Sequence, residues 1–435
     1  MPDATTAAAE DPARLAAWLA RNAVDSLPDG ALAGRLAAAR VQGRPLRVKL
    51  GIDPTAPDIH LGHAVVLRKL SEFQQAGHKV VLIIGDYTAR VGDPSGRSEL
   101  RPMLSPEQIG QNAATFQEQA LKILDADPER LEVRRNGEWL DMPMADLLGL
   151  VRTTTAAQLL ERDDFAKRWS ANEPISLLEL LYPLLQAYDS VAIDADVELG
   201  GTDQKFNLLL GRDIQRAYGK PEQAILTMPL LAGIEGQRKM SKSLGNQIGI
   251  TDPPQEIYGK TMSIPDEAIV EYRRLLLERD DDPLAPVAGG STAEASADAE
   301  ASAAAGAGAA PTALAGSSAR DAKRALAREL VQWLYSAQDA DAAERHFERV
   351  FVEHEMPEEI AEASFARDAG ALHLPGLMAA EFGMSSSQAR RLIDQGGVTL
   401  GEASLAPGEY DVPGERADGQ VLRVGKRRFR RLRAA

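Results

Sequence analysis

The spacing of apolar residues between Pro45 and Asp86 predicts a strand, a helix and a second strand. From Pro45 to Ile52, apolar residues alternate with polar residues or glycine, as in a strand with one buried face. From His63 to Ala76 they recur at helical spacing and stop at a glycine, and a second apolar run spans Lys79 to Asp86. Such a unit needs a right-handed crossover and a parallel sheet, which binds ligands at the carboxyl ends of its strands. The pattern therefore predicts a Rossmann-type α/β domain.

This domain is predicted to extend from about residue 45 to 249. Its further elements are a helix over 105–124 that Ser105 caps, a strand over 131–135, inserted helices over 139–169, a helix over 175–188 and a strand ending near 201. Residues 1–44 predict one or two amphipathic helices, which we expect to pack on the main domain. The inserted helices are a natural place for a subunit interface.

Two further regions follow the α/β domain. Residues 250–355 predict helices rich in charge, interrupted at 288–319 by a stretch of almost only Ala, Gly, Ser and Thr. That stretch has too few large apolar side chains to offset the entropy lost on ordering, so we expect a linker or insertion; an Ala-rich helix is the alternative. Residues 373–435 predict a small α+β domain, with a capped helix from Ser385 and a strand over 398–400.

Composition limits the classes of protein to which the chain can belong. Its 435 residues are enough for two or three domains, its net charge is −15, and it has no cysteine. The acidic charge argues against general attraction to nucleic acid or membranes, and the lack of cysteine excludes disulfides and thiolate metal sites. We recognise no signal peptide and no apolar run long enough to span a membrane, so we expect a soluble cytoplasmic protein.

One local patch departs from the acidic average. Residues 423–435 contain seven lysines or arginines and no acid, interleaved with apolar residues. A basic tail that keeps the protein soluble is one interpretation. We favour contact with RNA phosphates, because a helix with two adjacent arginines precedes this stretch. The residues predicted to bind RNA are Arg390, Arg391, Lys426, Arg427, Arg428 and Arg430.

Candidate chemistry begins at His60-Leu-Gly-His63, where the first predicted strand gives way to the helix. A helix N-terminus offers free N–H groups and the positive end of the helix dipole, which suit phosphate, and two imidazoles add donors. Gly62 leaves the backbone bare, so a flat base can lie against it. Alone, this tetrapeptide is as compatible with an ordinary helix start as with a functional site.

A second motif, Lys239-Met-Ser-Lys-Ser243, changes this balance. Its two lysines lie in a glycine-flanked loop and provide two cations for a polyphosphate. Together, and in this order, the two motifs resemble the two signatures of class I aminoacyl-tRNA synthetases, with Leu61 in place of the usual Ile. The resemblance implies the Rossmann fold of that family and its use of ATP with Mg²⁺.

The amino acid that is used depends on a third pattern. Tyr182, Gln186 and Asp189 stand at i, i+4 and i+7, so on a helix they fall within roughly 60° on one face. Their neighbours are mostly leucines, which indicates a lined pocket, although a polar helix edge is the simpler alternative. This pattern, the Gly-Asp-Pro-Ser-Gly sequence at 92–96 and the Gly-Gly-Thr-Asp-Gln sequence at 200–204 resemble tyrosyl-tRNA synthetases, and the resemblance covers most of the chain outside 288–319.

The resemblance implies a role for each matching residue. The ammonium group of tyrosine would be held by Asp93, Tyr182 and Gln186, and the phenol hydroxyl by Asp189. ATP and the adenylate would be bound by Gly51, Asp53, His60, Gly62, His63, Gly201, Asp203, Gln204, Lys239 and Lys242. The residues acting on the phosphates would be Thr55, His60, His63, Lys239, Lys242, Arg97 and Arg101. The site would also be lined by Asn136 and Trp139.

One position departs from the family pattern. Many bacterial tyrosyl enzymes have a tyrosine, a second partner for the phenol, two residues before the glycine of the first strand, and here that residue is Lys49. The sequence therefore resembles a different branch, which the complete Lys-Met-Ser-Lys-Ser motif also fits. The C-terminal segment resembles the RNA-binding module of ribosomal protein S-four, and the helices before it imply contact with the anticodon arm.

The implied reaction is the activation of L-tyrosine by ATP and the transfer of tyrosine to the 3′ end of tRNA(Tyr), in a homodimer. A tryptophanyl-tRNA synthetase shares both signatures, but residues 200–204 and the C-terminal module argue against it. A simple nucleotidyltransferase would lack the lysine motif. A synthetase-derived RNA-binding protein without charging activity remains an alternative that the intact motifs disfavour.

Overall fold

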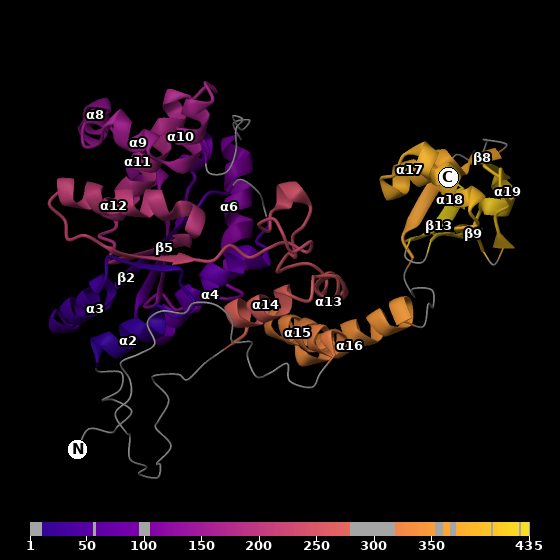
Figure 1. The fold of residues 1–435 in the computed structure, drawn as a ribbon, viewed down its shortest axis with the longest axis horizontal. Helices are drawn as coiled ribbons and strands as arrows, with labels where there is room; N and C mark the ends of the chain where they lie inside the picture. Colours follow the sequence, from indigo (N-terminus) through magenta and orange to yellow (C-terminus); the bar gives the residue numbers. More distant parts are fainter. Residues whose placement is uncertain are drawn as a thin grey trace, which may run out of the picture. The chain divides into compact units, whose positions relative to one another are not determined.

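The computed structural model describes residues 11–54, 58–94, 105–278, 318–352, 360–365, 371–401, 403–425 and 428–434. The chain divides into two compact units, residues 1–336 and 337–435 (Figure 1). The first unit contains a six-stranded sheet, and the second contains a five-stranded and a two-stranded sheet. The low-complexity stretch predicted at 288–319 lies outside the described residues as far as residue 317.

The six-stranded sheet is parallel except at one edge. Its strands, in spatial order, are β1 (Asp25–Leu27), β6 (Ala224–Met228), β5 (Val197–Gly201), β2 (Arg47–Ile52), β3 (Lys79–Ile84) and β4 (Leu131–Arg135). Only β1 runs antiparallel to its neighbour. Because the chain order reverses between β2 and β5, a crevice opens there at the carboxyl ends of these two strands. The predicted Rossmann-type parallel sheet is confirmed.

Helices cover both faces of this sheet. In Figure 1, α11 (Leu177–Ala192) and α12 (Lys205–Ala217) lie on one side, and α3 (Ala31–Val41) and α4 (Leu61–Gln75) lie on the other. The remaining helices of the unit are α2 (Pro12–Leu19), α5 (Thr88–Val91), α6 (Pro106–Ala120), α7 (Gly137–Leu140), α8 (Met144–Val151), α9 (Ala156–Leu160), α10 (Asp163–Ser170), α13 (Pro254–Met262), α14 (Ala268–Leu276) and α15 (Ala319–Leu334).

Local sequence patterns predicted most of these elements correctly. The predicted cap of α6 is confirmed, since Ser105 and Gln108 exchange hydrogen bonds in a capping box. The inserted helices predicted over 139–169 correspond to α7 through α10. The helices predicted before residue 45 are confirmed as α2 and α3, but the strand β1 between them, which adds to the edge of the sheet, was not predicted.

The first strand of the predicted unit is also buried differently from expectation. A strand with one exposed face should present Lys49 to solvent, but Lys49 is fully buried between Val48 and Leu50. The reason is that β2 is central, so its middle residues are covered on both faces. The ammonium group of Lys49 is neutralised by Glu198, its paired residue on β5.

The second unit consists of helices followed by two small sheets. Its elements are α16 (Ala337–Phe347), η4 (Glu348–Val352), β7 (Glu362–Phe365), β8 (Ala371–His373), α17 (Leu374–Phe382), α18 (Ser386–Asp394), β9 (Val398–Leu400), β10 (Ala403–Ser404), β11 (Asp411–Pro413), α19 (Gly414–Ala417), β12 (Val421–Val424) and β13 (Arg428–Ala434). The helix capped by Ser385 and the strand over 398–400 are confirmed as α18 and β9. The sheet also includes β7, which pairs with β13 and precedes residue 373.

Candidate functional site

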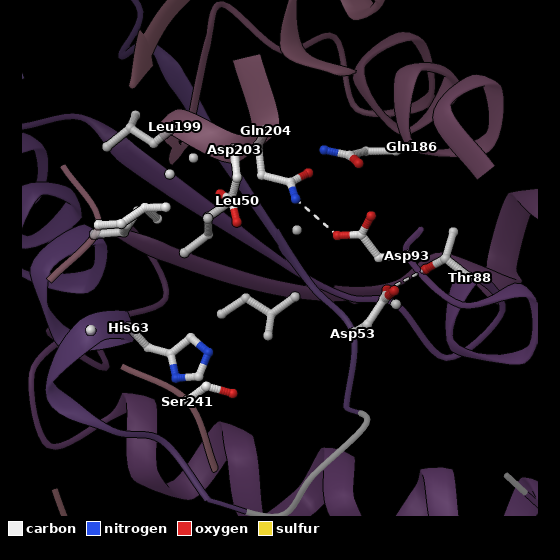
Figure 2. Close-up of a pocket in the computed structure, with 18 of the residues that line it drawn as sticks. Leu50, Asp53, His63, Thr88, Asp93, Gln186, Leu199, Asp203, Gln204 and Ser241 are labelled. Atoms are coloured by element: carbon white, nitrogen blue, oxygen red, sulfur yellow. Dashed lines mark hydrogen bonds between the residues drawn. The ribbon is translucent and has the colours of Figure 1, made fainter. Parts of the chain in front are cut away.

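A cavity of about 780 Å³ lies at the carboxyl ends of β2 and β5 (Figure 2). It contains most of the residues that the sequence singled out. Those that line it are Gly51, Asp53, His60, Gly62, His63, Asp93, Asn136, Tyr182, Gln186, Asp189, Gly201, Asp203, Gln204, Lys239 and Lys242. Three predicted residues, Thr55, Arg97 and Arg101, lie outside the described part of the chain. The fold thus brings together segments separated by nearly 200 residues of sequence.

The two histidines begin α4 at one side of the cavity. His60 is the N-cap of the helix, and its ring stacks on that of His63 with centroids 3.9 Å apart. Burial lowers the pKa of His60 to about 2 and that of His63 to about 4, so both imidazoles are neutral at pH 7. A Cβ on Gly62 would stand 3.0 Å from the ring of His60, so only glycine fits without displacing that ring.

The lysine motif lies in a loop that rests on two carboxylates of the cavity. Lys239 Nζ is 3.0 Å from Asp203 Oδ2, and Lys242 forms an ion pair with Asp58. The loop itself is held by Asn246, whose side chain accepts a hydrogen bond from the Ser241 N–H and donates one to the Lys239 carbonyl. Both lysine side chains remain partly exposed, so incoming phosphates can reach them.

The cavity is also lined by a buried carboxylate. Asp189 accepts a hydrogen bond of 2.8 Å from Trp139 Nε1 and one of 3.4 Å from Asn136 Nδ2. Burial, opposed by the nearby charge of Lys49, raises the pKa of Asp189 to about 7. Of the two further residues predicted to line the site, Asn136 lines the cavity, whereas Trp139 is not among its lining residues and supports Asp189 from behind it.

Tyr182 is hydrogen-bonded to a second carboxylate of the cavity, that of Asp53. Its hydroxyl donates to Asp53 Oδ2 at 2.8 Å, and Thr88 Oγ1 donates to the other oxygen of Asp53 at 2.6 Å. Burial raises the pKa of Tyr182 well above its usual value, so the phenol stays protonated and acts as a donor. Figure 2 shows that Asp53 and Asp93 lie on the same side of the cavity.

Asp93 belongs to a network of amides that crosses the cavity. Gln204 Nε2 donates to Asp93 Oδ2 at 2.8 Å (Figure 2), and Asn207 Nδ2 donates to the carbonyl oxygens of both Gln204 and Gln186. Arg162, from the inserted helices, reaches Asp93 Oδ1 at 3.4 Å. Because each amide is bonded to the next, the residues predicted to hold an ammonium group are fixed in orientation.

Sequence reasoning missed three residues of this site. Thr88 follows the end of β3 and had no motif around it. Asn207 stands three residues after Gln204 and lies on the buried face of α12. The signal in the sequence was this spacing, which brings the two amides close together on a helix. Arg162 had no sequence signal, because its contact with Asp93 depends on how the inserted helices pack.

The arginines predicted to bind RNA fall into two groups. Arg390, Arg391 and Arg428 are exposed on α18 and β13. Arg430 is instead engaged within the unit, since its Nε donates to Glu381 at 2.8 Å and its guanidinium lies over the ring of Phe382. It therefore joins β13 to α17. The two other predicted residues, Lys426 and Arg427, lie outside the described part of the chain.

The described residues contain neither a cluster suited to a metal ion nor a helix suited to a membrane. Among these residues, no cluster of three or more His, Cys, Asp or Glu side chains is arranged to hold a metal ion. None of the described helices is both long enough and apolar enough to cross a membrane.

Comparison with known proteins places this site in a family. The family described as "tRNA synthetases class I (W and Y)" matches residues 41–352. A tyrosine–tRNA ligase of Thermotoga maritima is 47% identical over 416 residues, which cover 95% of this chain and 96% of the relative. A tyrosine–tRNA ligase of Moorella thermoacetica is 46% identical over 428 residues, covering 97% and 96%. The tryptophanyl alternative is therefore not favoured.

Solved structures show the same fold at lower sequence identity. A C-terminally truncated mitochondrial tyrosyl-tRNA synthetase of Aspergillus nidulans superposes with a TM-score of 0.58 at 20% identity, covering 80% of this chain and 99% of that chain. The tyrosyl-tRNA synthetase of Archaeoglobus fulgidus, solved with L-tyrosine, gives 0.54 at 22% identity, covering 77% and 99%. On its two signature motifs, its fold and relatives that match it almost end to end, the chain belongs to the tyrosyl-tRNA synthetases, within the class I tRNA synthetase family.

Proposed function

We propose that this protein activates L-tyrosine with ATP and transfers the tyrosyl group to the 3′ end of tRNA(Tyr). One observation carries the proposal: a single cavity is lined both by a buried carboxylate, Asp189, and by the two lysines of the loop. The carboxylate suits a phenol hydroxyl, and the lysines suit a polyphosphate. A substrate that joins an aromatic amino acid to a nucleotide phosphate would contact both.

The amino acid half of the cavity offers complementary partners to tyrosine. The phenol hydroxyl would donate to Asp189, which Trp139 and Asn136 hold in place. The ammonium group would lie against Asp93 and Gln186, which the amide network orients. A buried acceptor left without its hydroxyl is costly, so this arrangement selects tyrosine over phenylalanine.

The nucleotide half offers donors for ATP. Gly62 and Gly201 line the cavity where a base and a ribose would lie, and Asp203 would bind the ribose hydroxyls. The phosphates would lie at the N-terminus of α4, between the neutral histidines and the lysine loop. Any Mg²⁺ that enters with ATP would be held mainly by the phosphate oxygens, and it would neutralise part of their charge.

The chemistry of activation needs alignment more than proton transfer. The carboxylate of tyrosine is already ionised at neutral pH and attacks the α-phosphate directly, so no general base is required. The protein would align the two groups and stabilise the charge that builds on the departing pyrophosphate. Neutral histidines serve as hydrogen-bond donors to that charge, and Lys239 and Lys242 serve as cations.

The direct test is amino-acid-dependent exchange of pyrophosphate into ATP, measured with tyrosine, tryptophan and phenylalanine in parallel. Exchange with tyrosine alone is expected. Exchange with tryptophan would overturn the assignment of Asp189 to a phenol, and no exchange with any of the three would refute the proposed activity. Transfer to tRNA is then measured with radiolabelled tyrosine. We propose that the protein acts in the cytoplasm, whose reducing conditions a cysteine-free chain suits.

Tyrosine affinity is expected to depend on pH through Asp189. Because its pKa is raised to about 7, the carboxyl is increasingly protonated below that pH and loses the charge that strengthens its bond with the phenol. The dissociation constant for tyrosine should therefore rise as pH falls from 8 to 6, which equilibrium dialysis measures. The same titration on Asp189→Asn should be flat over this range; an equal slope would assign the effect to another group.

The exposed arginines of the second unit are expected to serve tRNA. Replacing Arg390 and Arg391 with alanine removes two charges from α18, so the KM for tRNA in aminoacylation should rise about tenfold at moderate salt, with pyrophosphate exchange unchanged. Arg130→Ala, at an exposed arginine of the first unit, is the matched control. Unchanged charging kinetics in the double variant would remove α18 from the RNA surface.

We also propose a homodimer formed through the inserted helices. Apolar side chains are exposed there on three helices, namely Met144 and Leu148 on α8, Trp169 on α10 and Leu177 on α11. Leu148→Asp should give a monomer in sedimentation velocity, because a charge would be buried in the contact. Val41→Asp, at an even more exposed apolar residue on α3, should leave the dimer intact, and dimers in both variants would place the interface elsewhere.

A further inference from the structure

A buried ion pair lies directly beneath the amino acid half of the cavity. Lys49 on β2 and Glu198 on β5 are paired residues in the sheet, and Nζ of Lys49 is 2.7 Å from Oε1 of Glu198. The exposed fractions of the two side chains are 0% and 1%, so neither can reach solvent or a ligand. Lys49 does not line the cavity, although its neighbour Leu50 does.

The pair is bonded to the helix that carries the amino acid site. Nζ of Lys49 donates to the carbonyl oxygen of Gln186 at 2.9 Å and to Oγ of Ser190 at 2.8 Å. These two residues enclose Asp189, since Gln186 lies one turn before it and Ser190 directly follows it. All three donor positions of the ammonium group are thus used, one on Glu198 and two on α11.

Glu198 closes the network on the other side. Its Oε2 accepts a hydrogen bond of 3.2 Å from Ser190 Oγ and a further one from Gln223, which is itself buried. Ser190 is therefore bonded to both members of the ion pair. These buried hydrogen bonds connect the central strands β2 and β5 to one turn of α11.

We propose that the Lys49–Glu198 pair is a positioning element: it fixes the turn of α11 that presents Gln186 and Asp189, and so sets the preference of the site for an amino acid with a phenol hydroxyl. This inference rests on the proposed function. Stability alone does not account for the pair, because two buried charges cost as much in desolvation as they gain from each other, and apolar residues would fill the space as well. The ion pair differs from apolar residues in that it orients α11, because it forms hydrogen bonds to defined atoms of that helix.

The same pair also sets the charge around Asp189. Lys49 lowers the pKa of that carboxyl and Glu198 raises it, while burial dominates both. The groups that face Asp189 from the elements packed against it are Lys49 of β2, Glu198 of β5, Asn136 and Trp139 at α7, and Tyr182 of α11. Removing one member of the pair therefore changes both position and charge, whereas removing both changes mainly position.

Three variants separate these effects: Lys49→Met, Glu198→Gln and the double variant Lys49→Met with Glu198→Gln. The control is Arg168→Met with Glu179→Gln, which removes another buried ion pair, between α10 and α11; Glu179 lies about three turns of α11 from Asp189. For each we would measure KM for tyrosine and for ATP in pyrophosphate exchange, the ratio of kcat/KM for tyrosine over phenylalanine, and the pH profile, with melting curves as a check of folding.

Lys49→Met is expected to raise the KM for tyrosine and to lower the tyrosine preference, each by about tenfold, with the KM for ATP unchanged. The inflection of its pH profile should move to higher pH. In the double variant the inflection should return toward that of the wild type while the preference stays low. The double variant carries no unpaired buried charge, so it keeps the test valid if Lys49→Met fails to fold.

An unchanged tyrosine preference in the folded double variant would overturn the inference, as would a loss no larger than that of the Arg168 and Glu179 control. Equal changes in KM for tyrosine and ATP would also overturn it, because they would indicate general damage to the fold. Absence of tyrosine-dependent exchange in the wild type would refute the proposed function itself and this inference with it.

Discussion

Asp189→Asn is expected to lower kcat/KM for tyrosine in the activation step by roughly two orders of magnitude, or about 3 kcal/mol. The change replaces a charged acceptor with a neutral amide of the same shape, so the phenol loses its charge-assisted hydrogen bond. The amide also places an NH2 donor where one of the two carboxylate oxygens accepted from Trp139 or Asn136, which leaves one of these groups unsatisfied. Pyrophosphate exchange at varied tyrosine concentration measures the loss.

The nucleotide side provides the internal control for this variant. ATP occupies the opposite end of the cavity in the proposed arrangement, so its KM should remain within about twofold of the wild type. Phenylalanine has no hydroxyl to lose, and its activation should change little, so the preference for tyrosine should largely disappear. Equal losses for tyrosine and phenylalanine would show that Asp189 does not contact the phenol.

The second large effect is expected at Lys242. Lys242→Ala removes a cation that the proposal places on the departing pyrophosphate, so the rate of tyrosyl-adenylate formation in a single turnover should fall about 100-fold. The equilibrium dissociation constant for tyrosine should not change, since Lys242 pairs with Asp58 and the proposal places it on the phosphates and not on tyrosine. The two quantities together separate stabilisation of the transition state from substrate binding.

A nearby arginine is the matched control for Lys242. Arg238 belongs to the same loop and is exposed, but its guanidinium pairs with Glu235 instead of a residue of the cavity. Arg238→Ala removes an equal charge and should leave the single-turnover rate close to that of the wild type. A normal rate in Lys242→Ala, or the same loss in both variants, would exclude a specific role for Lys242.

Local patterns predicted those parts of the fold that depend on neighbours in sequence. The capping box at Ser105, the helix after His60 and the strand over 131–135 each follow from residues within a few positions of one another. The strand β1 was missed because it is only three residues long and is defined by its pairing with β6, about 200 residues away. Such pairing leaves no periodic trace in a short segment.

The site shows the same division. The histidine and lysine motifs could be recognised because each is contiguous, and resemblance to a family joined them. The buried partner of Lys49 could not be predicted, since Glu198 lies on a strand that becomes adjacent only in the folded sheet. The contact of Arg162 with Asp93 likewise depends on how the inserted helices pack, which no local pattern in the sequence predicts.

The resting contacts of the lysine loop have a consequence for the order of events. Asp203 is the proposed ribose partner, and here its Oδ2 is 3.0 Å from Nζ of Lys239, so a ribose hydroxyl that bonds to this oxygen would compete with the lysine. In the proposed binding mode, nucleotide entry would release this lysine toward the phosphates. Because ion pairs this exposed contribute only about 0–1 kcal/mol, the competition weakens ATP binding less than tenfold. In this binding mode, ATP itself would break the weak ion pair that holds Lys239 of the loop to Asp203.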